Sequence, residues 1–244
     1  MARLTKKQLK RHELACERLE KQSLSLEDKI FIYENWQEGY GRSQKEAGIF
    51  FTPSDLASDI AYDVGDGQVI DLCAGTGILS FFAHQLAILR GYKVSYTCVE
   101  ANCRLVEVGK RLFPEANWIC ADIGEVYKTL GQFDCAIANP PFNASLKIKN
   151  APRYSGNRTE FQVIDIAHTI AERGVFIVPG ELIPFNGNFL PQESKSYKKF
   201  HLETEIRLTA DGMGIVPSSY KKDDYRSKYF FNCQMAYFDQ SENH

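Results

Sequence analysis

The chain has 244 residues, which is enough for one α/β domain with a short extension and a sizeable hydrophobic core. Hydrophobic residues make up 44% of it and charged residues 25%, which are ordinary values for a globular protein. The formal net charge of −2 neither favours nor excludes nucleic acid as a partner. Because the N-terminus has no apolar core and no apolar run approaches the length of a membrane span, we expect neither a signal peptide nor a membrane protein.

Seven cysteines are scattered along the chain, and none belongs to a Cys-x-x-Cys pair. Their number is odd, and several lie in predicted buried strands. This usage is typical of a reduced, cytoplasmic protein, and it argues against a framework of disulfides or zinc sites.

Two helices are predicted ahead of the main domain. Residues 4–22 carry a narrow apolar stripe with helical spacing, and Ser25 with Asp28 forms a capping box at the start of a second helix. The charged, turn-like stretch 39–48 links this helical part to the rest of the chain. We therefore predict an N-terminal helical extension over residues 1–48 and a main domain over residues 49–244.

A Thr-Pro step opens the main domain. Thr52 is a good N-cap and Pro53 a good first helical residue, so a helix is predicted to start here. The apolar residues Leu56, Ile60 and Val64 follow at helical spacing. Plain helix capping is one interpretation of this pattern.

A strand, a tight turn and a helix come next. The apolar, β-branched run at residues 69–72 ends in a turn that holds Gly75 and Gly77, and an apolar helical segment follows over residues 78–90. Glycines in such a turn let the backbone approach a ligand closely. A dinucleotide-binding turn would have a third glycine where this chain has Ser80. The acidic Asp71 at the strand end would repel a pyrophosphate and suits a ligand that carries an ammonium group.

Two further strands end in acidic residues. Residues 93–99 lead to Glu100, and residues 118–121 lead to Asp122. A carboxylate at the end of the second strand can accept hydrogen bonds from both hydroxyls of a ribose. The alternative is that Glu100 is a solvated turn residue.

A buried strand at residues 133–138 is broken abruptly by Asn139, Pro140, Pro141 and Phe142. Two prolines remove two backbone donors and fix φ, so the chain leaves the sheet in a rigid loop. This loop presents the side-chain amide of Asn139 and the carbonyl of Pro140 as acceptors, beside an aromatic ring. The alternative is a tight turn that merely ends a strand.

The remaining pattern completes an α/β domain. A helix over residues 161–173 precedes a fifth strand at 175–178, and residues 205–209 and 229–238 are predicted to form a closing antiparallel pair. Helices separate the first five strands. We therefore predict a seven-stranded, mostly parallel sheet with helices on both faces.

Three of these motifs resemble those of one enzyme family. Asp-x-x-x-Gly-x-Gly resembles the first motif of Rossmann-like methyltransferases that use S-adenosylmethionine, and Asn-Pro-Pro-Phe resembles the catalytic motif of methyltransferases acting on planar exocyclic amines. Phe-Phe-Thr-Pro resembles the Phe-Tyr-Thr-Pro element of adenine-N6 DNA methyltransferases, including the modification subunits of type I restriction systems. The order of the motifs resembles the gamma class of that family, over about residues 49–238.

This resemblance implies a class I methyltransferase fold, S-adenosylmethionine as the cofactor, and a set of site residues. Asp122 is placed to accept a hydrogen bond from the adenine amine of the cofactor, and Ile123 to pack on its ring. The implied catalytic residues are Asn139, Pro140, Pro141 and Phe142. The implied cofactor-binding residues are Phe51, Thr52, Pro53, Asp71, Cys73, Gly75, Gly77, Glu100, Asp122, Ile123 and Asn139.

The implied reaction is methylation of adenine N6 in DNA, on a base flipped out of the duplex, with no metal required. A specificity subunit or a restriction subunit is a possible partner within a restriction–modification system. The alternatives are methylation of adenine N6 or guanine N2 in RNA, or of a protein glutamine. A non-catalytic accessory subunit is a third interpretation, against which the complete set of motif residues argues.

A basic loop follows the catalytic motif. Between Asn139 and Thr159 every charged side chain is basic, which favours contact with a polyanion. The predicted nucleic-acid contacts are Lys147, Lys149, Arg153 and Arg158. Residues 181–229 are too few for an ordinary target-recognition domain, so specificity is expected to be relaxed, built from loops or delegated to another subunit.

Overall fold

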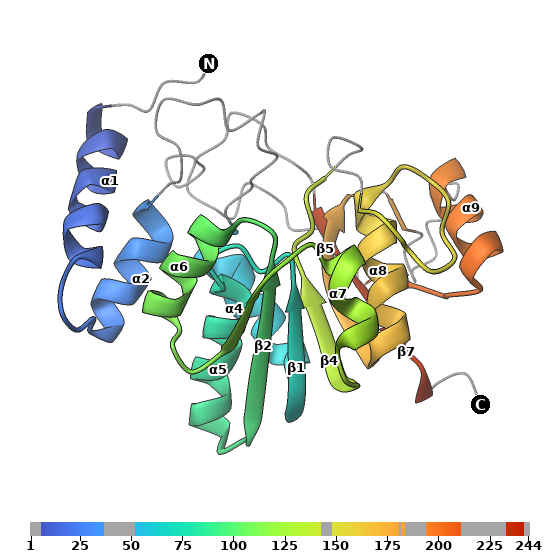
Figure 1. Cartoon of the computed structure of the whole chain (residues 1–244), viewed down its shortest axis with the longest axis horizontal. Coiled ribbons are helices and arrows are strands. Elements are labelled where there is room, and N and C mark those ends of the chain that lie inside the picture. Colours follow the sequence, from blue (N-terminus) through green and yellow to red (C-terminus); the bar gives the residue numbers. More distant parts are fainter. Residues whose placement is uncertain are drawn as a thin grey trace.

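The computed structural model describes residues 6–36, 52–142, 148–180, 182–183, 194–210 and 233–241. Within these ranges, seven strands form one sheet: β1 (Gly67–Leu72), β2 (Val94–Glu100), β3 (Asn117–Cys120), β4 (Phe133–Ala138), β5 (Ala171–Pro179), β6 (Thr209–Ala210) and β7 (Cys233–Asp239). Their order across the sheet is β3-β2-β1-β4-β5-β7-β6 (Figure 1). The first five strands are parallel, and β7 runs antiparallel to β5 and β6. The predicted seven-stranded, mostly parallel sheet is confirmed.

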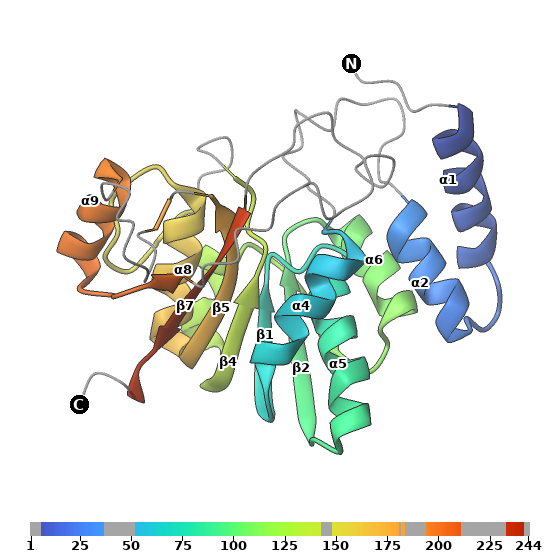
Figure 2. The same cartoon turned by 180° about the vertical axis from the view of Figure 1, so that it is seen from behind.

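Helices cover both faces of the sheet (Figures 1 and 2). One face carries α4 (Ser54–Val64), α5 (Ile78–Arg90) and α6 (Cys103–Leu112), with α1 (Lys6–Leu19) and α2 (Leu26–Asn35) beyond them at one end. The other face carries the short α7 (Ile123–Val126), which continues into a 3₁₀ turn at Tyr127–Thr129, and α8 (Thr159–Ile170), with α9 (Lys195–Thr204) at the far end. None of the helices in the described ranges is long and apolar enough to cross a bilayer.

The central strands are buried on both faces, as parallel strands between two helical layers must be. Successive residues of β1 point to opposite sides, so Val69 packs into one hydrophobic cluster and Ile70 into the other. On the α4–α6 side, the rings of Phe81 and Phe113 meet edge to face at 6.2 Å. On the α8 side, aromatic side chains from α8 and α9 pack together. This double burial is why the strands read as near-continuous apolar runs.

The N-terminal helices share the core of the main domain. The predicted capping box is present at the start of α2, where Ser25 and Asp28 bond to each other's backbone N–H groups. Ile32 and Tyr33 of α2 are buried in the same cluster as residues of α4 and α5. The helical part therefore contributes directly to the packing beneath the first glycine-rich turn.

Two predicted boundaries are wrong. Helix α8 ends at Ile170, and β5 begins at Ala171, four residues before the predicted strand. Pairing with β7 extends β5, and the guanidinium of Arg173 donates to backbone carbonyls at the end of α4. Near the C-terminus, Glu205 ends α9 in a left-handed conformation (φ 60°), so the predicted strand at 205–209 shortens to Thr209–Ala210.

Candidate active site

The polar residues singled out in the sequence follow neighbouring strands at one edge of the sheet. Asp71 lies at the end of β1, Glu100 ends β2, Asp122 follows β3, and Asn139 follows β4. Since β3, β2, β1 and β4 are adjacent and parallel, their carboxyl ends lie side by side. In open α/β sheets this edge is where ligands bind.

The turn after β1 uses left-handed backbone at three positions. Cys73 has φ 62°, Gly75 φ 59° and Gly77 φ 84°. A side chain on Gly77 would meet the Trp118 ring at 2.8 Å, so this glycine is required by packing. At Gly75, by contrast, no described atom lies within 4 Å of where a Cβ would be, so its backbone borders open space. The hydroxyl of Tyr33 donates to the carbonyl of Thr76 in this turn (3.3 Å), a support that the sequence did not indicate.

Asp71 is 1% exposed and lies beneath the turn. Its Oδ2 accepts a hydrogen bond from the Ser80 hydroxyl at 2.8 Å, which explains why serine stands where a dinucleotide-binding turn has glycine. Within the described ranges its Oδ1 has no hydrogen-bond partner. Burial raises the pKa of Asp71 to about 7, against the opposing effect of the Ser80 hydrogen bonds. The site therefore holds a buried carboxyl group that lacks one donor.

Glu100 joins two loops at the strand ends. Its Oε2 accepts from the backbone N–H of Gly75 at 2.9 Å, and its Oε1 accepts from the N–H of Asn102 at 2.8 Å. Glu100 therefore fixes the glycine turn to the loop after β2, and it is not simply a solvated turn residue.

Asp122 and Ile123 begin α7. The Oδ1 of Asp122 caps this helix by accepting from the N–H of Gly124 at 2.8 Å. Ile123 is 4% exposed, and its side chain belongs to the hydrophobic cluster on the α8 side. Asp122 is thus held at the sheet edge, whereas the side chain of Ile123 points mainly into the core.

The side-chain amide of Asn139 is oriented by a residue far away in sequence. Its Nδ2 donates to the Thr52 hydroxyl oxygen at 2.9 Å. Its Oδ1 is buried and finds no hydrogen-bond partner among the described residues. Phe142 lies half-buried against the cluster that α4 and α5 build.

The predicted N-cap role of Thr52 is wrong. The N-cap of α4 is Pro53, which makes no side-chain capping bond, and the helix begins at Ser54. The hydroxyl of Thr52, which is 8% exposed as a residue, is used by Asn139 instead. The Thr-Pro step and the Asn-Pro-Pro-Phe motif, separated by 87 residues, therefore meet at the site. Phe51 lies outside the described residues.

Arg153 is committed to the protein itself. Its Nε pairs with Oδ1 of Asp165 at 2.8 Å, its backbone N–H donates to the same carboxylate, and its Nη1 donates to the carbonyl of Thr204. Because Asp165 is fully buried, this ion pair anchors the loop after the catalytic motif to α8 and α9. The nucleic-acid contact predicted for Arg153 does not fit this arrangement, and Lys147 lies outside the described residues.

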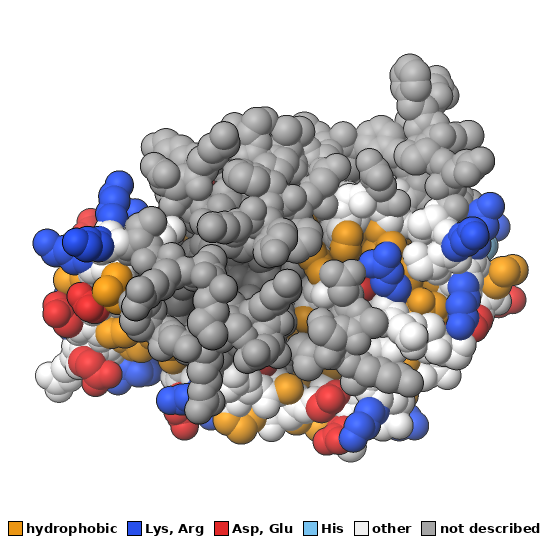
Figure 3. Space-filling model, turned by 90° about the horizontal axis from the view of Figure 1, so that it is seen from above, with side chains coloured by type: hydrophobic (Ala, Val, Ile, Leu, Met, Phe, Trp, Pro, Cys, Tyr) orange, Lys and Arg blue, Asp and Glu red, His pale blue; other side chains and the backbone are white. Residues whose placement is uncertain are grey.

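Two predicted basic contacts remain on the described surface. Lys149 is exposed, and Arg158 lies 3.7 Å from the buried Glu160. Arg158 borders a cavity of about 440 Å³ where the loop meets α9, and Lys199 of α9 lies on its other side. Seen from above, Lys and Arg side chains gather over α1 at one end of the molecule and over α9 at the other (Figure 3).

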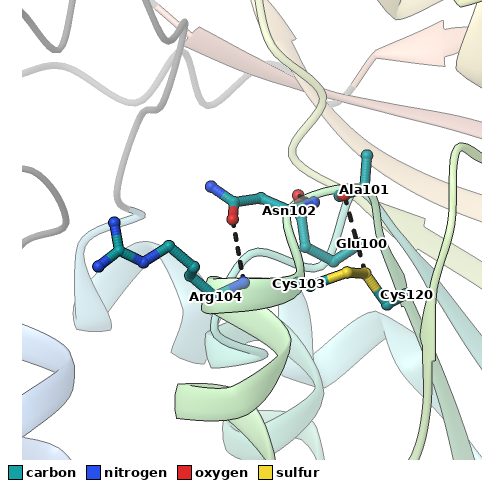
Figure 4. Close-up of a disulfide and its surroundings, with 6 residues drawn as sticks. All are labelled: Glu100, Ala101, Asn102, Cys103, Arg104 and Cys120. Carbon is teal, nitrogen blue, oxygen red and sulfur yellow. Dashed lines mark hydrogen bonds between the residues drawn. A yellow bond between two sulfur atoms is a disulfide. The ribbon is translucent and has the colours of Figure 1, made fainter.

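A disulfide joins Cys103, at the start of α6, to Cys120, at the end of β3 (Figure 4). The prediction that the cysteines are reduced is wrong for this pair. The two Cα atoms lie 5.3 Å apart because β2 and β3 are neighbours and Glu100 stands directly opposite Cys120. Sγ of Cys120 lies 3.8 Å from the carbonyl oxygen of Ala101. Because a disulfide sulfur carries no hydrogen, this contact is not a hydrogen bond. The disulfide thus ties together the two loops that carry Glu100 and Asp122.

The other five cysteines are free thiols, and three of them are buried. Nowhere in the described ranges do three or more His, Cys, Asp or Glu side chains come together in a way that could hold a metal ion. The chemistry of the described site therefore consists of carboxyl, amide and backbone groups around a glycine turn.

Comparison with known families and structures is consistent with this geometry. Residues 54–153 match the family model of the methyltransferase small domain, which spans the glycine turn, the acidic strand ends and the Asn-Pro-Pro-Phe motif. The chain has no match among curated proteins.

Several solved structures share the fold. A protein of Pyrococcus horikoshii described as an RNA methyltransferase aligns with a TM-score of 0.56 and 17% identity, over 88% of this chain and 98% of that one. A protein of Listeria monocytogenes described as a class I S-adenosylmethionine-dependent methyltransferase aligns at 0.54 and 13% identity, over 91% and 69%.

A third structure comes from a restriction–modification system. The methyltransferase subunit of a type I system of Streptococcus thermophilus aligns at 0.53 and 17% identity, over 78% of this chain and 44% of that one. At these identities the likeness concerns the fold. Residues 54–153 are thus similar to a methyltransferase small domain, the chain has the class I methyltransferase fold, and S-adenosylmethionine is the cofactor that these matches imply.

Proposed function

We propose that this protein transfers a methyl group from S-adenosylmethionine to the exocyclic N6 amine of adenine in DNA. The observation that carries the proposal is the amide of Asn139, whose buried Oδ1 has no donor in the described structure. A buried acceptor without a partner costs free energy, so its retention beside a rigid Pro-Pro loop is best explained by a substrate that donates to it. An amino group is such a donor.

The cofactor fits the glycine turn and the acidic strand ends. Among the described residues, no side chain fills the space at Gly75 that the cofactor would enter, and none donates to Oδ1 of Asp71, which suits the ammonium of the methionine part. Glu100, held at the strand end beside Gly75, is proposed to accept from the ribose hydroxyls, and the second carboxylate oxygen of Asp122 is proposed to accept from the adenine amine. When bound, the cofactor supplies an electrophilic methyl group on its sulfonium.

The acceptor amine must be made more nucleophilic. The lone pair of an aryl amine is delocalised into the ring, so hydrogen bonds from its N–H groups to Asn139 Oδ1 and to the carbonyl of Pro140 favour a pyramidal nitrogen. The same two oxygens offset the positive charge that develops on nitrogen during transfer. Since the Pro-Pro loop is rigid, both acceptors keep their positions, and alignment with the methyl donor supplies much of the rate increase.

An adenine inside a duplex cannot reach this site, so the base must be flipped out. Phe142 follows the two prolines and offers an aromatic face on which the flipped base can stack. Lys149, Arg158 and Lys199 are proposed to contact the phosphate backbone near the loop and α9.

DNA is favoured over RNA by the resemblance of the Phe-Phe-Thr-Pro element to adenine-N6 DNA methyltransferases. On the same resemblance, a specificity subunit is proposed as a candidate partner.

Transfer of tritiated methyl groups to DNA, to structured RNA and to protein, assayed side by side, tests the proposal. We expect incorporation into DNA and recovery of N6-methyladenine after digestion to nucleosides. Labelling of RNA or protein with none in DNA would reassign the substrate. Absence of transfer to all three would contradict the proposal.

A further inference from the structure

The hydrogen bond between Thr52 and Asn139 connects two motifs that carry different expected roles. The resemblance places Thr52 with the cofactor and Asn139 with the substrate, yet their side chains lie 2.9 Å apart, and Thr52 is 8% exposed. Thr52 makes no capping bond to α4, so capping does not explain its hydroxyl. What remains is the effect of this hydroxyl on the amide.

A side-chain amide presents two different edges. Rotation by half a turn exchanges a carbonyl oxygen, which only accepts, for an NH₂ group, which only donates. With Nδ2 bonded to Thr52, the buried Oδ1 becomes the group offered to a substrate. In the reverse orientation the NH₂ group of Asn139 would face the N–H groups of the substrate amine. Two donors cannot form a hydrogen bond, so the amine would bind poorly.

We infer that Thr52 is a positioning residue for methyl transfer: its hydroxyl oxygen accepts from Nδ2 and restrains the rotation of the Asn139 amide, which leaves Oδ1 to accept from the substrate amine. This inference rests on the proposed function. The hydrogen bond has a second effect, because an amide that donates from nitrogen is polarised and carries more negative charge on its oxygen. Thr52 thereby strengthens the acceptor at the point where positive charge develops on the substrate nitrogen.

The decisive pair of variants is Thr52→Val, which keeps the shape and removes the hydroxyl, and Thr52→Ser, which keeps the hydroxyl. We expect Thr52→Val to lower kcat on an adenine-containing DNA duplex by about tenfold, the scale of one hydrogen bond. Affinity for S-adenosylmethionine, measured by calorimetry, should change less than about twofold on the same scale. Thr52→Ser should restore kcat to near the wild-type value.

A spectroscopic measurement tests the orientation without any turnover. The side-chain amide resonances of Asn139, assigned by their loss in Asn139→Asp, should shift in Thr52→Val and stay near their wild-type positions in Thr52→Ser. This result can be obtained even if the protein methylates a substrate other than DNA, so failure of the inference is distinguishable from failure of the proposed function.

Measuring Thr52→Val in the Asn139→Asp variant shows whether Thr52 acts on the orientation of the amide or on general packing. In Asn139→Asp both carboxylate oxygens accept, so rotation changes nothing, and adding Thr52→Val should lower kcat much less than it does beside Asn139. Three results would each overturn the inference: unshifted Asn139 resonances in Thr52→Val, an equal effect of Thr52→Val in both backgrounds, or weaker cofactor binding with kcat unchanged. The last of these would return Thr52 to a direct cofactor contact. Thermal unfolding of each variant confirms that the comparison is made on folded protein.

Discussion

At the scale of single residues, the site combines acceptors that are buried before any ligand arrives. Asp71 and Asn139 each have a buried oxygen for which the described residues supply no donor. Such groups lower stability, so each marks a place where binding a donor recovers free energy. For Asp71, the free energy that burial costs can be followed as a function of pH, because burial raises the pKa of its carboxyl group from 3.8 to about 7.

The first prediction concerns this titration. Below about pH 3.8 the carboxyl group is protonated in both the folded and the unfolded states, and between 3.8 and about 7 only the folded state keeps the proton. The contribution of Asp71 to the free energy of unfolding is therefore full at low pH and is lost as pH rises through about 7. The stability of Asp71→Asn relative to wild type should increase over this window when followed by urea unfolding.

The same group predicts how cofactor affinity depends on pH. A bound ammonium favours ionised Asp71, so affinity should rise with pH toward about 7, by at most about tenfold per unit. Asp71→Asn should bind more weakly at neutral pH and lose the dependence. Calorimetric titrations of wild type with a flat pH profile would contradict an ammonium contact at Asp71.

Gly75 gives a third residue-scale prediction. Gly75→Val should abolish S-adenosylmethionine binding, because its side chain would enter the open space beside the turn while φ stays near 59°. Gly91→Val is the matched control: Gly91 has φ 70°, no described atom near its Cβ position, and lies at the opposite end of α5. Both variants should lose similar stability from backbone strain. Unchanged cofactor affinity in Gly75→Val would show that the site is misassigned.

At the scale of elements, local signals predicted the structure well where they were strong. Helix α5 and strand β4 have the predicted boundaries, because Gly91 ends the one and two prolines end the other. The polar strand ends lie side by side because the sheet is parallel there, as the alternation of strands and helices predicts.

What the sequence missed depends on contacts between distant residues. The Thr52–Asn139 hydrogen bond and the Arg153–Asp165 pair join segments whose proximity no local pattern encodes. Likewise, the Cys103–Cys120 disulfide follows from the register of β2 and β3, and two cysteines 17 positions apart carry no such signal by themselves. The early start of β5 reflects pairing with β7, which overrides local propensity.

The disulfide carries the prediction at this scale. Closing a loop of this length stabilises a chain by about 3 kcal/mol, or about 6–12 °C in Tm for a protein of this size. Dithiothreitol should therefore lower Tm by this amount in wild type, and Cys103→Ser/Cys120→Ser should show the lower Tm with no response to reductant. A response that persists in the double variant would place the effect on another cysteine.

At the scale of the whole molecule, the basic loop that follows the catalytic motif is anchored to α8 and to the end of α9 through Arg153. Phosphate contacts give affinity that depends on salt and not on sequence. We therefore predict that the protein binds many DNA sequences similarly and loses affinity steeply as salt rises. Replacing Lys149, Arg158 and Lys199 by Ala should weaken binding and flatten the salt slope, by up to about 0.9 per lost phosphate contact.

The control for this surface lies at the other end of the molecule. Lys7→Ala, Lys10→Ala and Arg11→Ala together remove equal charge from α1, away from the loop (Figure 3). Arg153 is left intact because it anchors the loop through Asp165. Equal losses of affinity in the two triple variants would show that net charge, and not this surface, governs binding. A long, strictly read target motif for the isolated protein would move recognition to other segments.

The most direct test of the account is the turnover of Asn139→Ala. The amide oxygen is proposed to act on the substrate amine alone, so this variant should lose methyl transfer to DNA by about 100-fold or more, as when one positioned polar group is removed from an active site. S-Adenosylmethionine affinity, measured by calorimetry on the same protein, should stay within about twofold of wild type. Wild-type turnover in Asn139→Ala, or loss of cofactor binding in parallel with activity, would contradict the assignment of Asn139 as the group that receives the adenine amine.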